Sequence, residues 1–134
     1  RTIHDVTYYN DSKGTNVDAS MKALDAFPQG HLILIAGGYD KQTPLDDFMA
    51  LAAKRVDTLI LIGDAADRFE AAAKKAGIAD IRRTGYSMEG AIMLARSIAK
   101  APQAVLLSPA CSSFDMYDNF EQRGRVFKGI VNAI

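Results

Sequence analysis

His31 to Ala36, which reads HLILIA, is apolar without a break from Leu32 onward and is followed directly by Gly37-Gly38. Asp57 to Ile62, which reads DTLILI, repeats this pattern before Gly63. Short, mostly apolar runs that stop at a turn residue are typical of strands buried within a parallel sheet. These two stretches therefore predict the centre of an α/β fold.

Strand-like and helix-like runs alternate along the rest of the chain. The further strands expected are Thr2-Ile3, joined by a His4-Asp5 turn to Val6–Tyr9, then Asp80–Arg83 and Gln103–Leu107. Five helices are expected. The first carries Val17, Met21 and Leu24 behind a Thr15-Asn16 cap, and the second carries Leu45, Phe48, Met49 and Ala52 with Pro44 in its first turn. The third spans residues 65–76 and is ended by Gly77, the fourth begins near Ser87, and the last carries Phe120, Phe127, Val131 and Ile134 on one side. Such alternation predicts a three-layer α/β/α sandwich with a Rossmann-like, mostly parallel sheet and flanking helices.

The length and composition indicate one soluble domain. The chain has 134 residues, is 49% hydrophobic and carries 16 basic and 16 acidic residues, so no charge excess points to nucleic acid or membranes. Its apolar runs are far shorter than the ~20 residues that cross a bilayer, and no signal peptide is expected. Cys111 is the single cysteine, which excludes an internal disulfide, and no residue cluster has metal-ligand spacing. We expect no metal site and a cytoplasmic location.

Asp11-Ser12-Lys13-Gly14-Thr15-Asn16 follows the first long strand and precedes a helix. A lysine, hydroxyls and free backbone N–H groups at a helix start can hold an anion. The alternative is that Thr15 or Asn16 only caps the helix and that Lys13 is solvated. The segment lacks the glycine spacing and the Gly-Lys-Ser/Thr end of a Walker phosphate loop.

Gly37-Gly38-Tyr39-Asp40-Lys41 follows the HLILIA run in the same way. Paired glycines let a backbone turn sharply or approach a ligand closely, and Lys41 could then meet a carboxylate or phosphate. An ordinary strand-to-helix turn with an exposed lysine is the alternative. The Gly-x-Gly-x-x-Gly fingerprint of dinucleotide sites is absent.

The third loop runs from Ser108 to Asn119, with Phe120 at the start of the last helix. Ser112, Ser113 and the backbone N–H groups there suit a second carboxylate, whereas the simpler alternative is ordinary loop chemistry with Phe120 in the core. Cys111 has no histidine near it in the sequence, which favours a small buried residue over a nucleophile. Ligands of open α/β sheets bind at the carboxyl ends of the strands, so these loops predict one shared polar site.

These three segments together resemble the Mur ligases, the amide ligases of peptidoglycan precursor synthesis. The resemblance lies in NDSKGTN at residues 10–16, GGYDK at 37–41, and LSPACSSFD at 107–115 with NFEQRG at 119–124. The last segment is most similar to the members that add D-glutamate. The resemblance as a whole covers residues 1–134. It implies that this chain is the C-terminal, amino-acid-binding domain of a three-domain enzyme, whose UDP-binding and central ATPase domains would lie outside this chain.

The resemblance implies an ATP-dependent ligase of the bacterial cytoplasm that serves cell-wall biogenesis, and through it cell shape and division. The complete enzyme is expected to form an acyl phosphate on UDP-N-acetylmuramoyl-L-alanine, which the D-glutamate amine then attacks. ATP and Mg²⁺ would be held mainly by the central domain. We therefore expect this domain to bind D-glutamate and close over ATP, to supply no catalytic residue, to be inactive alone, to be monomeric, and to have no nucleic-acid or membrane partner.

The resemblance also implies roles for individual residues. The two D-glutamate carboxylates would be held by Lys13, Thr15, Lys41, Ser113 and the backbone at Phe120. Asp11, Ser12 and Asn16 would lie near the nucleotide or order their loop. Two other functions stay open: a ligase domain of the folylpolyglutamate synthetase type, and a free-standing α/β ligand-binding or interaction module without catalysis.

Overall fold

The computed structural model describes all residues 1–134 and has a six-stranded sheet with five helices packed on it. The strands are β1 (Thr2–Ile3), β2 (Val6–Asn10), β3 (Leu32–Gly37), β4 (Val56–Ile62), β5 (Ile81–Arg83) and β6 (Ala104–Leu107). The helices are α1 (Val17–Asp25), α2 (Asp46–Arg55), α3 (Ala66–Ala76), α4 (Met88–Ile98) and α5 (Phe120–Ala133). No helix has the length and apolarity that a membrane crossing requires.

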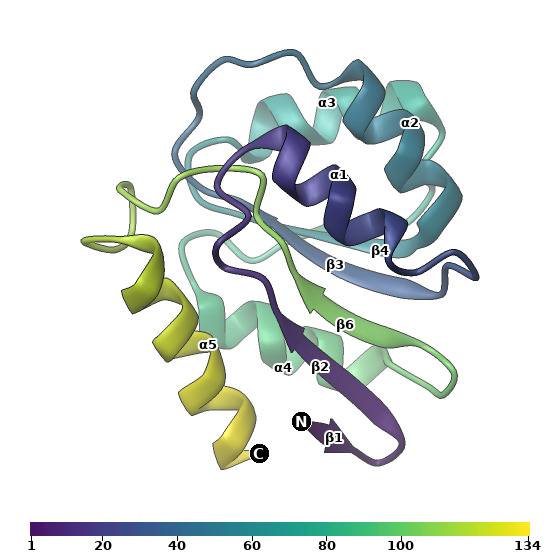
Figure 1. Cartoon of the computed structure of the whole chain (residues 1–134), viewed down its shortest axis with the longest axis vertical. Coiled ribbons are helices and arrows are strands. Elements are labelled where there is room, and N and C mark those ends of the chain that lie inside the picture. The colour runs from purple at the N-terminus through teal and green to yellow at the C-terminus, as the bar shows by residue number, and fades with distance from the viewer.

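The strands lie side by side in the order β1-β2-β6-β3-β4-β5 (Figure 1). All neighbours are parallel except β1, which pairs antiparallel with β2. The turn between them has positive φ at both His4 (50°) and Asp5 (66°), the backbone geometry that tight hairpins favour. The predicted mostly parallel α/β/α sandwich is confirmed.

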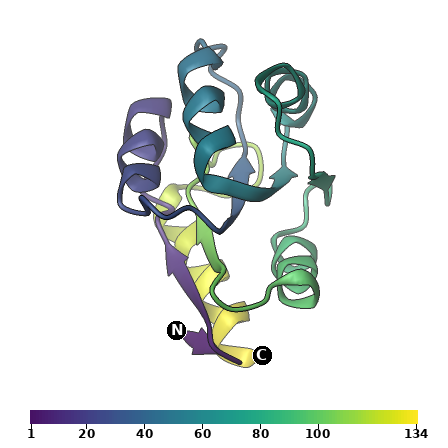
Figure 2. The ribbon, with the colours of Figure 1, turned by 90° about the vertical axis from the view of Figure 1, so that its right-hand side faces the viewer.

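Helices cover both faces of the sheet: α1, α2 and α3 lie on one side, α4 and α5 on the other (Figures 1 and 2). Along β3, Leu32 and Leu34 face the first group, whereas Ile33 and Ile35 face the second. The strand β4 repeats this alternation between leucines and isoleucines. Because successive side chains point to opposite faces, an unbroken apolar run fills two cores at once.

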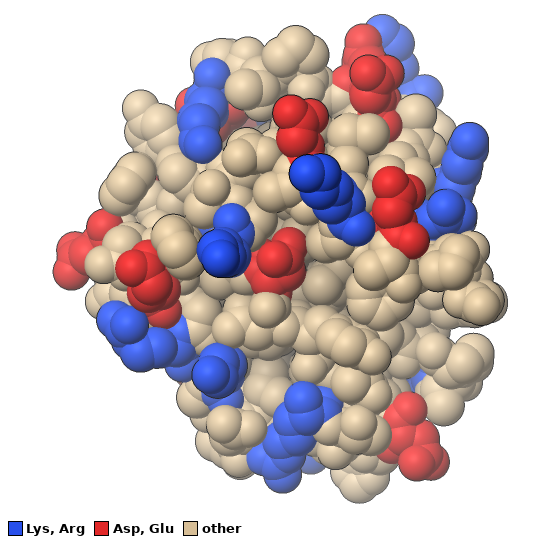
Figure 3. Space-filling model, viewed as in Figure 1, with Lys and Arg blue, Asp and Glu red and all other residues tan.

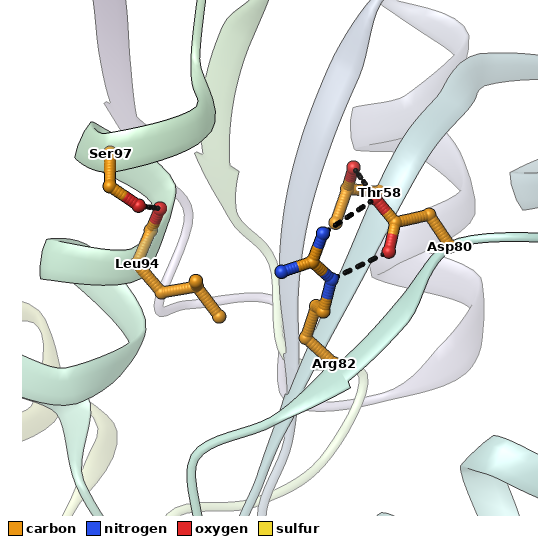
Figure 4. Close-up of polar contacts among 5 residues, drawn as sticks. All are labelled: Thr58, Asp80, Arg82, Leu94 and Ser97. Carbon is orange, nitrogen blue, oxygen red and sulfur yellow. Dashed lines mark hydrogen bonds and ion pairs between the residues drawn. The ribbon is translucent and has the colours of Figure 1, made fainter.

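The short edge strand β5 is fastened to β4 through Asp80 (Figure 4). Its carboxylate accepts hydrogen bonds from Thr58 Oγ1 at 2.9 Å and from Arg82 Nε at 2.7 Å. Those bonds come from both strands, so they add side-chain links to a ladder of only three residues. Figure 4 also shows the Ser97 hydroxyl donating to the Leu94 carbonyl within α4, at 2.7 Å.

Several helix ends match the predicted signals. Asn16 and Ser87 cap α1 and α4 by accepting from the backbone N–H three residues on, and Gly77 ends α3 at φ 95°. Several boundaries were wrong by about one residue, among them the starts of β4 at Val56, β5 at Ile81 and β6 at Ala104. Pro44 precedes the cap residue of α2 rather than lying in its first turn, and His31 precedes β3, because its φ of 60° is not a strand conformation.

Candidate functional site

Three loops leave the carboxyl ends of β2, β3 and β6 and meet at one edge of the sheet. We call them the first loop (residues 11–16), the second loop (38–45) and the third loop (108–119). Backbone hydrogen bonds run from Asp11 N to Leu107 O at 2.7 Å and from Ala110 N to Gly14 O at 2.9 Å. Tyr39 N also donates to Ser112 O, at 3.0 Å. Loops far apart in sequence therefore form one connected rim.

A hydroxyl cluster joins the first and third loops beneath this rim. The Ser108 hydroxyl donates to Asp11 Oδ2 at 2.7 Å and lies 2.8 Å from Ser20 Oγ, on α1. Gly14 lies against the cluster, since a Cβ on it would be 2.9 Å from Ser108 Oγ. Asp11 thus links the first loop to the third through Ser108, and Asn16 caps α1.

Arg123, from the first turns of α5, is the largest fully buried side chain, with 1% of its surface exposed. Its Nε donates to Ser12 Oγ at 2.9 Å, its Nη2 to Ser12 O at 2.7 Å and its Nη1 to Cys111 O at 3.0 Å. The Ser12 hydroxyl in turn donates to Phe120 O at 2.7 Å. One guanidinium therefore links the first loop, the third loop and α5.

No carboxylate forms an ion pair with Arg123, and burial lowers its pKa to about 10. The group therefore remains charged near neutral pH, stabilised by oxygen acceptors and not by a counter-ion. Sequence reasoning included Arg123 in the NFEQRG segment but assigned it no role. Its neighbours Glu121 and Arg125 are exposed, and nothing in the helical pattern distinguishes a basic side chain that turns inward.

A cavity of about 340 Å³ opens between the three loops and the start of α5. It brings together four of the five residues expected to hold D-glutamate. Its lining comprises Thr15, Lys41, Ser112, Ser113, Phe114, Asn119, Phe120 and Glu121. This volume lies in the lower part of the ~300–1,000 Å³ range of small-molecule sites. Each of the three loops supplies a hydroxyl or an ammonium group, which suits a small anion.

Phe120 is partly buried and lines this cavity instead of joining the core formed by Phe127 and Val131. Its carbonyl already accepts from Ser12, and its position at the α5 start puts free N–H groups nearby. The core alternative for Phe120 is therefore wrong. Ser113 is 2% exposed and so lies deep in the wall.

Lys13 lies apart from the other four residues. It lines a neighbouring hollow of about 260 Å³, together with Asn10, Ser12, Gly124, Arg125 and Lys128, while Phe120 and Glu121 border both spaces. Lysine and arginine side chains gather over α5 on this face of the molecule (Figure 3). The first loop therefore points Thr15 and Lys13 toward two different spaces.

Cys111 is 3% exposed, and burial raises the pKa of its thiol to about 12. A thiol that stays protonated at neutral pH is a poor nucleophile, so its expected place as a small buried residue is confirmed. His4 and His31 are exposed and lie away from the cavity. The structure holds no group of three His, Cys, Asp or Glu side chains arranged to bind a metal ion.

The parallel α/β sheet, with three polar loops around a cavity at the carboxyl ends of its strands, defines an α/β domain whose family can be stated. The model of the Mur ligase family described as its glutamate ligase domain matches residues 1–111. The chain therefore belongs to the Mur ligase family and corresponds to that domain.

The most informative relatives are named UDP-N-acetylmuramoylalanine--D-glutamate ligase. The protein of Symbiobacterium thermophilum is 46% identical over 134 residues, which is 100% of this chain and 29% of the relative. That of Clostridioides difficile is 44% identical over the same shares, and that of Caldicellulosiruptor bescii is 42% identical over 98% of this chain and 28% of its own. The chain spans less than a third of these relatives. Their alignments include the third loop and α5, which extend beyond the family-model match.

Proposed function

We propose that this domain binds D-glutamate for a ligase that joins it to UDP-N-acetylmuramoyl-L-alanine in peptidoglycan precursor synthesis. The observation that carries the proposal is the cavity shared by Thr15, Lys41, Ser113 and Phe120. D-Glutamate has two carboxylates, and the cavity offers an ammonium group on one loop and hydroxyls on two others. The names of the aligned relatives support this ligand over other small anions.

In the complete ligase, ATP supplies the phosphoryl group that activates the L-alanine carboxylate as an acyl phosphate. The D-glutamate amine then attacks that carbonyl carbon, and phosphate leaves. The residues of this domain hold the amino acid by its carboxylates, so that its amine is free and aimed. Holding two reactants in line contributes strongly to the rate of such a step.

The domain itself offers little for the rest of the chemistry. It has no Walker phosphate loop and no three-residue cluster for a metal ion, so ATP and Mg²⁺ belong mainly to the central domain in this proposal. Lys13 and its hollow lie next to the cavity, with Phe120 and Glu121 bordering both spaces. We further propose an enzyme of the bacterial cytoplasm, because nucleotide-linked precursors are soluble substrates. We also propose that this enzyme is a monomer.

Lys41→Ala in the complete ligase tests the proposal. We expect the KM for D-glutamate to rise by about tenfold or more, because one charge-assisted contact is lost, while the KM for ATP changes little. Steady-state kinetics with each substrate varied in turn measures both values. Lys54→Ala, on the exposed end of α2 and outside the cavity, is the control.

Equal losses for both substrates would contradict the assignment of Lys41. An NMR titration of the 134-residue chain separates the alternatives further. Shifts at Thr15, Lys41 and Ser113 with D-glutamate, but not with L-glutamate or ATP, favour the proposed ligand. Shifts with ATP alone favour a nucleotide-binding module instead.

A further inference from the structure

The second loop, which carries Lys41, is fastened to α3 by an ion pair outside the cavity. Arg68 Nε donates to Asp40 Oδ2 at 2.8 Å, and Arg68 Nη2 donates to Asp40 Oδ1 at 2.8 Å. Neither residue lines the cavity. The Asp40 side chain is only 13% exposed and that of Arg68 33%, so this bidentate pair is better shielded from solvent than an ordinary surface ion pair.

Asp40 also holds the residue on the far side of Lys41. Its Oδ1 accepts from Gln42 N at 2.8 Å, which closes a small ring around Lys41. Gln42 has φ 61°, a backbone conformation that non-glycine residues adopt only when the surroundings hold them there. The Asp40 carboxylate thus ties the backbone of Gln42, on one side of Lys41, to Asp40 on the other side.

The start of the second loop is fixed independently. Gly38 O accepts from Ala65 N at 3.0 Å, and Tyr39 N donates to Ser112 O at 3.0 Å. Lys41 itself is exposed and takes part in no ion pair. Its position therefore depends on the backbone that Asp40 holds, and Asp40 is oriented by Arg68.

We propose that Arg68 is a positioning residue for amino-acid binding, acting through Asp40 on the backbone that presents Lys41 to the cavity. The inference rests on the proposed function and extends it to a residue outside the cavity. The Arg68 hydrogen bonds also lower the pKa of Asp40 from its ordinary value. Lysine cannot replace arginine fully here, because one ammonium group cannot match both carboxylate oxygens.

Arg68→Gln and Arg68→Lys in the complete ligase test this role. We expect Arg68→Gln to raise the KM for D-glutamate by about tenfold and Arg68→Lys by about threefold, because a misplaced binding group loses much of its contact. The KM for ATP and kcat should stay within about twofold. Lys74→Gln is the matched control, since Lys74 lies on the same helix but pairs with Glu70 at 2.9 Å, away from the loop.

A purely structural role for Arg68 predicts a different result. Loss of folded enzyme lowers the apparent kcat for every substrate without a selective change in the KM for D-glutamate. Thermal melting of each variant shows whether the kinetics are measured on folded protein. A selective rise in that KM, with partial rescue by lysine, supports positioning, whereas an unchanged KM overturns it.

A double-mutant cycle tests whether Arg68 acts through Lys41. In a Lys41→Ala background, Arg68→Gln should add less than about a twofold further change, because the group that it positions is gone. Fully additive effects would overturn the proposed route. If Lys41→Ala alone leaves the KM for D-glutamate unchanged, the proposed function of the cavity fails instead.

Amide hydrogen exchange of the 134-residue chain tests the positioning without any substrate. Gln42 N–H donates to Asp40, so we expect its exchange to be about tenfold or more faster in Arg68→Gln than in Lys74→Gln. Unchanged exchange at Gln42 would show that Arg68 does not order this loop. That result would overturn the inference and leave the proposed ligand unaffected.

Discussion

Arg123 shows how one side chain can connect segments that are distant in the sequence. It reaches Ser12 and Cys111 from α5, and both acceptor carbonyls belong to loops that line the candidate site. Because these bonds are buried, their loss would leave oxygen atoms without partners in a place that water does not reach. Removing the guanidinium is therefore destabilising, even though a buried charge is itself costly to accommodate.

Arg123→Met should therefore lower the free energy of unfolding by about 3 kcal/mol. Urea unfolding of the 134-residue chain at neutral pH measures the change. Arg125→Met is the matched control, because Arg125 lies two residues further on but is exposed, and its loss should cost less than about 0.5 kcal/mol. Similar losses in the two variants would show that the buried hydrogen bonds of Arg123 do not stabilise the fold.

At the scale of elements, the turns after β3 and β4 pass very close to each other and to the third loop. Gly63 has φ 76°, and a Cβ on it would collide with the Asp115 carboxylate and lie 2.8 Å from Gly38 Cα. Gly77, the α3 cap, has φ 95° but open space around it. Both positions need the left-handed backbone conformation, but only at Gly63 is there also no room for a side chain.

Gly63→Ala and Gly77→Ala separate these two requirements. We expect Gly77→Ala to cost about 1 kcal/mol from backbone strain and Gly63→Ala about 3 kcal/mol from strain plus displacement of the neighbouring loops. Denaturant unfolding of both variants gives the comparison. Equal costs would mean that Asp115 and Gly38 move aside freely, so that only the backbone conformation matters.

At the scale of the whole molecule, the pH dependence of stability combines carboxylates with opposite pKa shifts. Hydrogen bonds from Arg68 and Arg82 lower the pKa values of Asp40 and Asp80 below their usual 3.8. As the pH falls through that region, the unfolded chain takes up these protons first, so stability is lost. Burial raises the pKa of Asp115, which has the opposite effect.

We therefore expect the free energy of unfolding to fall as the pH is lowered from about 4.5 to 2.5. Asp80→Asn should show a shallower fall, because one stabilising carboxylate no longer titrates. Asp115→Asn should show a steeper one, because its opposing contribution is removed. Urea unfolding at several pH values measures these slopes, and parallel curves for all three proteins would contradict the proposed origin of the dependence.

Much of the fold follows from local sequence patterns. The HLILIA and DTLILI runs indicated buried parallel strands, and the caps Asn16, Ser87 and Gly77 depend only on backbone groups a few residues away. The placement of the candidate cavity also followed, because the carboxyl ends of parallel strands share one edge of a sheet. Local rules suffice wherever the interacting groups are close in the chain or related by sheet geometry.

The tertiary structure alone decided which side chains of these loops point to the same space. Thr15, Lys41 and Ser113 share a cavity, whereas Lys13, two residues from Thr15, lines another hollow. The inward turn of Arg123 and the pairing of Arg68 with Asp40 depend on contacts across 111 and 28 positions of the chain. Sequence periodicity carries no information on such pairs, because burial and hydrogen bonding are satisfied only after the loops have packed together.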